Sequence, residues 1–112
     1  MAEFSNVTDQ TANRAYNTVY QNLTGRSILV QVSNACSINA QTIASGSKAQ
    51  AFVGPNNPPT LLVEEAGFLD SIFDGAILAP LVFVVPAGFF YEVVGYVDNN
   101  STIGITHWIE VL

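Results

Sequence analysis

The stretch from Leu81 to Val97, LVFVVPAGFFYEVVGYV, reads as two apolar strands joined at a tight corner. Pro86 fixes φ and lacks an N–H, and Gly88 permits positive φ, so the Pro-Ala-Gly segment predicts the corner. The strands expected at 81–85 and 89–97 are rich in Val, Phe and Tyr, which suit a pleated sheet. A strand with one solvated face alternates apolar and polar residues, but here both faces are apolar. Both faces of this strand pair therefore need cover.

The second strand shows the problem most clearly. Phe89, Tyr91 and Val93 share one face, which we expect to be the core of the domain. A chain of 112 residues covers that face with a second sheet of its own. The opposite face then predicts contact with another subunit, through Phe90, Val94 and Tyr96.

The charge content supports the same interpretation. Charged residues make up 11% of the chain, against about 25% in an average soluble domain. One alternative is a soluble domain coated with Ser, Thr, Asn and Gln, but we favour a subunit whose surface is largely interface. The net charge of −6, with three basic residues, disfavours binding to nucleic acid and to anionic membranes.

No segment is predicted to target or cross a membrane. The N-terminal sequence MAEFSNVTDQT lacks the basic and apolar regions of a secretory signal. The longest apolar run, 77–90, contains two prolines and a glycine and is shorter than the ~20 residues of a spanning helix. We therefore expect a protein that is made in the cytoplasm and has no membrane partner.

Apolar segments separated by short turns predict an all-β fold. A Gly-containing turn between the first two segments predicts a β-hairpin, and residues 54–59 predict a loop. We expect an antiparallel β-sandwich, or a squashed barrel, of about seven to eight strands. The expected strands are 15–21, 27–33, 48–53, 60–64, 81–85, 89–97 and 103–111.

The chain divides into an extended N-terminal arm, 1–13, and a β-sandwich domain, 14–112. The arm is polar, with Phe4 and Val7 as its sizeable apolar residues. It is either disordered in isolation or anchored on a neighbour by these two side chains. Residues 65–76 predict a short helical turn or an extended loop. Further interface candidates lie there: Phe68, Leu69, Ile72 and Phe73.

The sequence offers little for catalysis or metal binding. The lone His107 and lone Cys36 predict neither a zinc site nor a catalytic dyad. Acidic residues cluster loosely at Glu64, Glu65, Asp70 and Asp74, but without calcium-loop spacing. We predict no enzyme activity, no catalytic residue, no metal and no cofactor.

Two further arrangements remain as alternatives to a purely structural role. Glu92 and Glu110 lie on two late strands, and paired carboxylates are typical of glycosidases. Exposed aromatic side chains on a sheet can also stack on sugars, although we favour core or interface positions for them. The aromatic candidates are Tyr16, Tyr20, Tyr91, Tyr96 and Trp108.

Three patches in order along the chain carry a family resemblance. They are Arg14 followed by YQNLTGRSI at 20–28, then VVPAGFFYEV at 84–93, and then Trp108-Ile109-Glu110. Together they resemble small β-rich proteins and terminal domains of tailed bacteriophages, over residues 14–110. The pattern of that group is R…Y-x-N-x-T-G-R-x-I-x-V-x-V, V-P-x-G-x-x-Y-x-V and W-x-E.

The resemblance implies a structural virion component without catalytic residues. Such domains occur as head decoration (cement) proteins and as tail-fibre or receptor-binding parts, often as homotrimers. A chain of this length with an N-terminal arm and no fibre shaft favours the decoration role. The implied partners are the major capsid protein and further copies of the chain, on the outer surface of the capsid. The alternative is a tail-associated module that binds a host glycan.

Overall fold

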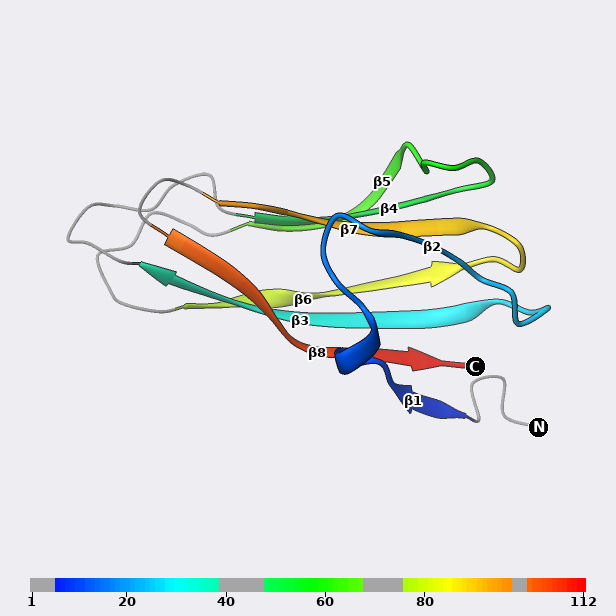
Figure 1. The fold of residues 1–112 in the computed structure, drawn as a ribbon, viewed down its shortest axis with the longest axis horizontal. Coiled ribbons are helices and arrows are strands. Elements are labelled where there is room, and N and C mark those ends of the chain that lie inside the picture. The colour runs from blue at the N-terminus through cyan, green and yellow to red at the C-terminus, as the bar shows by residue number, and fades with distance from the viewer. Residues whose placement is uncertain (1–5, 39–47, 68–75, 98–100) are drawn as a thin grey trace.

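A computed structural model describes residues 6–38, 48–67, 76–97 and 101–112. The described residues form two four-stranded sheets that pack face to face (Figure 1). All neighbouring strands are antiparallel, so the predicted β-sandwich is confirmed. Sheet A has the order β1 (Val7–Asp9), β8 (Ser101–Val111), β3 (Ile28–Ile38) and β6 (Ala76–Val85). Sheet B has the order β2 (Val19–Gln21), β7 (Phe90–Tyr96), β4 (Lys48–Gly54) and β5 (Leu61–Gly67).

The core lies between the sheets and follows the period of two along each strand. Residues 28–34 of β3, 81–85 of β6 and 90–94 of β7 bury every second side chain, as the sequence pattern predicts. The residues between the buried ones point away from the core. The fully or nearly fully buried apolar residues are Ile28, Val30, Val32, Ala49, Ala51, Val53, Ala66, Leu81, Phe83, Val85, Tyr91, Val93 and Trp108.

The hairpin predicted between the first two strands is wrong. β2 pairs with β7 in sheet B, whereas β3 pairs with β6 and β8 in sheet A. The turn at 22–25 therefore carries the chain from one sheet to the other. The strand expected at 15–21 is also shorter, because Asn17 takes a left-handed conformation with φ of 60° and ends the extended run.

The Pro86–Gly88 corner also joins the two sheets, since β6 belongs to sheet A and β7 to sheet B. The Phe89 N–H donates to the Pro86 carbonyl at 3.1 Å and closes the turn. Gly88 has φ of 81°, a conformation that L side chains rarely adopt. The predicted corner is confirmed, and it places the two apolar strands on opposite layers of the sandwich.

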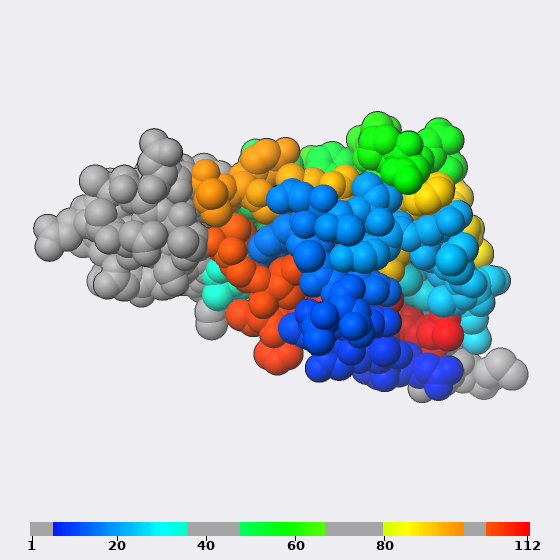
Figure 2. Space-filling model, in the orientation of Figure 1, coloured from blue at the N-terminus to red at the C-terminus, as the bar shows by residue number. Residues whose placement is uncertain are grey.

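Residues 6–13, the described part of the expected arm, lie on the sandwich. β1 pairs with β8, and the Asn6 and Leu112 backbones exchange hydrogen bonds of 3.0 and 2.7 Å. The 3-10 helix η1 (Thr11–Asn13) follows, and the Asp9 carboxylate accepts a 2.9 Å bond from the Thr11 N–H. Figure 2 shows this blue segment against the red and orange atoms of β8. From residue 6 onward, the chain thus adds an edge strand to its own sheet.

Strand ends differ from the expected ones at several places. β3 continues to Ile38 through a bulge at Val32/Asn34, beyond the strand expected at 27–33. β5 reaches Gly67, and β6 begins at Ala76 rather than Leu81. The loop predicted at 54–59 is confirmed between β4 and β5.

Candidate functional site

A largely buried carboxylate, that of Glu110 on β8, joins the two sheets. Its Oε2 atom accepts hydrogen bonds from the Tyr91 hydroxyl at 2.7 Å and from the Trp108 indole N–H at 3.0 Å. Arg14 donates to both carboxylate oxygens, from Nε at 3.1 Å and from Nη2 at 3.3 Å. The Tyr20 ring completes the cluster, because Arg14 Cζ lies 4.5 Å from its centroid. We call these five residues the Glu110 cluster.

The groups of the Glu110 cluster fix one another's protonation states. Burial raises the pKa of Tyr91 far above its ordinary value, and its bond to the Glu110 carboxylate raises it further. Desolvation lowers the pKa of Arg14, but Glu110 and Tyr91 outweigh that effect, so the net pKa of Arg14 is raised. The guanidinium therefore stays charged and the phenol stays neutral. Four hydrogen bonds fix the position of the Glu110 carboxylate. This arrangement favours a role in stabilising the fold over a role in proton transfer.

The two carboxylates considered for glycoside hydrolysis do not meet. Glu110 points between the sheets, where it contacts Tyr91. Glu92 is the next residue after Tyr91 on β7, so its side chain points to the opposite face of sheet B. The two carboxyl groups therefore lack the facing geometry of a glycosidase site.

A second polar cluster holds the corner between β6 and β7. Asn22 is 2% exposed, and its amide nitrogen donates to the carbonyls of Val85 at 2.9 Å and Pro86 at 3.2 Å. Its amide oxygen accepts bonds from the Thr24 N–H at 3.1 Å and the Thr24 hydroxyl at 2.6 Å. Its backbone carbonyl accepts a 2.9 Å bond from the Gly88 N–H. The first two family-like motifs of the sequence therefore meet at this corner.

Most of the aromatic residues considered for sugar stacking face inward. Trp108 is fully buried and Tyr91 is 1% exposed. Tyr20 packs on both rings, with centroids 5.9 and 5.8 Å away. Tyr16 is half-buried, and its hydroxyl donates to the buried Asn34 side chain. Of the five candidates, Tyr96 alone is classed as exposed, at 45%.

Sequence reasoning missed a row of apolar side chains across the outer face of sheet A. The register pairs Val7 with Val111 and Val111 with Leu29. It also pairs Leu29 with Val84. Directly opposite residues of antiparallel strands share a face, and the neighbours of Leu29 and Val84 along their strands are buried. Each strand of sheet A thus contributes one residue to this apolar row.

The next row of sheet A continues the apolar surface on two of its strands. Val82 and Ile109 flank the exposed Gln31, and Asp9 ends the row on β1. Val7 is 69% exposed, Val84 is 49% and Val82 is 44%. These values are high for large apolar side chains that lie together on one sheet face, and contiguous exposed apolar surface indicates a contact site.

The interface residues predicted on β7 lie on the outer face of sheet B. Phe90 and Val94 are half-buried, and Tyr96 is exposed. This face is mixed in character. Lys48 lies 5.4 Å from the centroid of the Tyr96 ring, and Glu92 shares the same face as Phe90 and Val94.

The other predicted contact residues divide into two groups. Val7 lies on β1 within the apolar row. The remaining ones fall outside the described residues, so their predicted roles stay predictions: Phe4, Phe68, Leu69, Ile72 and Phe73.

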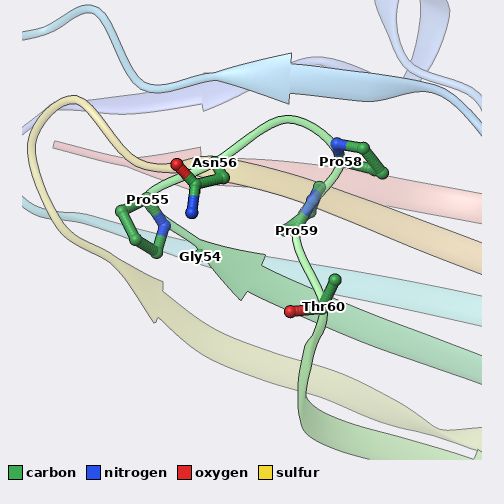
Figure 3. Close-up of a pocket in the computed structure, with 6 residues that line it drawn as sticks. All are labelled: Gly54, Pro55, Asn56, Pro58, Pro59 and Thr60. Carbon is green, nitrogen blue, oxygen red and sulfur yellow. The ribbon is translucent and has the colours of Figure 1, made fainter.

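A shallow hollow of about 80 Å³ lies at the β4–β5 loop (Figure 3). It is lined by Gly54, Pro55, Asn56, Pro58, Pro59 and Thr60, none of which is titratable. In the described part of the chain, no group of three or more His, Cys, Asp or Glu side chains is placed to hold a metal ion. Glu65 is within 3.6 Å of Lys48, whereas Asp70 and Asp74 lie outside the described residues. Among the described residues, no helix is long and apolar enough to cross a membrane.

No family model, curated protein sequence or solved structure matches this chain. The candidate site is therefore defined by geometry. The Glu110 cluster and the hydrogen bonds of Asn22 hold the interior of the fold together, and exposed apolar side chains lie on the outer faces of the two sheets.

Proposed function

We propose that this chain is a structural virion protein of a tailed bacteriophage, a capsid decoration (cement) protein that binds the assembled head as an oligomer. The sequence resemblance supports this role. The residues that carry it, in the Glu110 and Asn22 clusters, serve as internal anchors of the sandwich. Sequence motifs made of such residues identify the fold, and the residues that carry the function then lie on the surface.

One observation carries the proposal: the sandwich exposes large apolar side chains on its strands. Val7, Val82 and Val84 lie on sheet A, and the edge strand β5 exposes Leu61 and Leu62. An isolated soluble domain rarely presents so many apolar residues on regular strands. Such surfaces are expected of a subunit that is covered in an assembly.

The mechanism is mass action. A protein that binds the assembled shell, and binds free capsid subunits less well, stabilises the shell by its binding free energy. The major capsid protein is the proposed partner, and a homotrimer is the proposed oligomer. The net charge of −6 is compatible with a position on the outer surface, away from the packaged DNA.

The test compares phage particles that carry the protein with particles stripped of it. Heat and salt resistance should fall on stripping and return when purified protein is added back. Equal robustness of both particles contradicts the proposal. Counting copies per particle separates the decoration role, with on the order of hundreds expected from shell symmetry, from a tail-tip module present in far fewer copies.

A further inference from the structure

We propose that the open edge of β5 binds an extended segment of a partner protein, one that carries a Lys or Arg among apolar residues. The segment would add a strand to sheet B beside residues 61–64. The inference deepens the proposed function, because such a segment of the major capsid protein would form the contact with the shell. It rests on the proposed function for the identity of the partner, whereas the chemistry of the contact follows from β5 itself.

The edge strands of the two sheets differ in how well they can accept a further strand. In the described part of the chain, β1 and β6 end sheet A, and β2 and β5 end sheet B. β1 and β2 have three residues each. β6 is longer but contains Pro80, which has no N–H to donate to a neighbouring strand. β5 has seven residues and no proline, so it is the longest edge with every backbone N–H present.

The first half of β5 is poorly covered by the rest of the sandwich. β5 packs beside β6, and its Ala66 is 4% exposed. Leu61 is 65% exposed, however, and Leu62 and Val63 are exposed too, although successive residues of a strand point to opposite faces. Figure 1 shows the start of β5 raised above β4. An added strand would therefore pair with the free backbone groups and cover apolar side chains on both faces.

Glu64 determines the charge expected of the partner segment. It lies opposite the buried Ala51 of β4, so its half-buried side chain is on the inner face of sheet B, at the open edge. Its Oε1 atom accepts a 3.1 Å bond from the Glu65 N–H. Neither of the ion pairs found among the described residues includes Glu64. A Lys or Arg opposite Glu64 on the added strand supplies a partner, and the net charge of −6 also favours a basic segment.

A contact of this kind does not need the area of a large protein interface. In strand addition, backbone hydrogen bonds supply the affinity and side chains supply the specificity. Each protomer contributes its own β5 edge, so the contact is compatible with the proposed homotrimer. Three edges on one trimer would bind a shell more tightly than a single edge binds a free peptide.

The experiment titrates the purified full chain with synthetic peptides and follows its backbone amide signals by NMR. The probe is a short blocked peptide of alternating Lys and Val. One control peptide has Glu in place of Lys, and the other is the Lys-Val peptide with every backbone nitrogen methylated, which keeps the charge but lacks the donors. We expect the Lys-Val probe alone to bind, with a dissociation constant below about 1 mM and with shifts centred on residues 61–64.

Two substitutions test the role of charge. Glu64→Gln removes the charge at the open edge, and Glu92→Gln is the matched change on β7, an inner strand of sheet B. We expect Glu64→Gln to weaken binding of the Lys-Val probe about two- to fivefold, and Glu92→Gln to leave it unchanged. Circular dichroism establishes that both variants are folded. Absence of binding, or shifts centred on another edge, overturns the β5 site. Equal binding of the Glu-Val peptide, or an equal effect of the two substitutions, overturns the basic partner.

Shell binding is measured on the same samples, with and without excess Lys-Val probe. The probe should reduce shell binding by occupying the β5 edge, and shell binding that the probe leaves unchanged contradicts the β5 contact. A protein that binds the probe but not the shells contradicts the proposed function alone. A protein that binds shells but not the probe contradicts the β5 site alone.

Discussion

At the scale of single residues, Glu110 is the side chain on which the interior depends most. Its carboxylate accepts hydrogen bonds from Arg14, Tyr91 and Trp108, and its side chain is 12% exposed. Glu110→Gln keeps the shape but removes the charge that pairs with Arg14. We expect the free energy of unfolding to fall by about 2–3 kcal/mol, because the guanidinium is left partly buried without its partner.

Urea unfolding measures this loss, and Glu92→Gln is the matched control. Glu92 points to the outer face of sheet B, so its substitution should change stability by no more than about 0.5 kcal/mol. Equal urea midpoints for Glu110→Gln and wild type would show that the cluster contributes nothing to stability.

The raised pKa of Tyr91 predicts a loss of stability in alkali. An unfolded tyrosine ionises near its ordinary pKa of about 10, whereas burial and Glu110 keep the folded phenol protonated above that value. The folded state then binds more protons than the unfolded state, so stability is fully present below pH ~10 and falls as pH rises toward the folded pKa.

Urea midpoints measured from pH ~8 to ~11 test this sign. Tyr91→Phe, which has no phenol to ionise, should be less stable at neutral pH but should lose less stability across this interval. A midpoint for wild type that stays level through the interval contradicts the prediction.

At the scale of elements, two of the connections between the sheets, the turn at 22–25 and the Pro86–Gly88 corner, depend on one side chain. Asn22 bridges the turn at 22–25 to the Pro86–Gly88 corner through Val85 and Pro86. Asn22→Ala removes all of these bonds and leaves buried carbonyls without a donor. We expect a loss of about 3 kcal/mol in urea unfolding.

Gln21→Ala is the control at the same corner. Gln21 is exposed and makes one bond to the corner, from its amide nitrogen to the Gly88 carbonyl at 3.0 Å. Its substitution should cost less than about 1 kcal/mol. A similar loss in both variants would mean that the corner does not depend on the buried amide.

The sequence predicts which face of a strand is buried better than it predicts which strands pair. The alternation in Ile28, Val30 and Val32 marks the buried face because side chains on a strand have a period of two. The same period says nothing about which strand lies alongside. A short Gly-containing turn fits both a hairpin and a crossing between sheets, and the buried Asn22 amide determines the outcome only in three dimensions.

At the scale of the whole molecule, the apolar row shows why the candidate site was only partly predictable. Phe90, Val94 and Tyr96 are separated by two, four or six residues along one strand, so local alternation places them on one face. Val7, Leu29 and Val111 come from three strands far apart in the sequence, and only the register brings them together. Glu110 shows the opposite case, since a charged residue in an alternating strand resembles an outward position until its donors are known.

The apolar row and the net charge together predict how salt affects association of the whole molecule. Copies with a charge of −6 repel over the Debye length, which shrinks from about 10 Å at 0.1 M salt to about 3 Å at 1 M. The proposed contact between copies is apolar and is not weakened by screening, so sedimentation should show stronger association as salt rises. Association that falls with salt would instead indicate ion pairs between copies, and Lys48 and Glu65 of sheet B are candidates among the described residues.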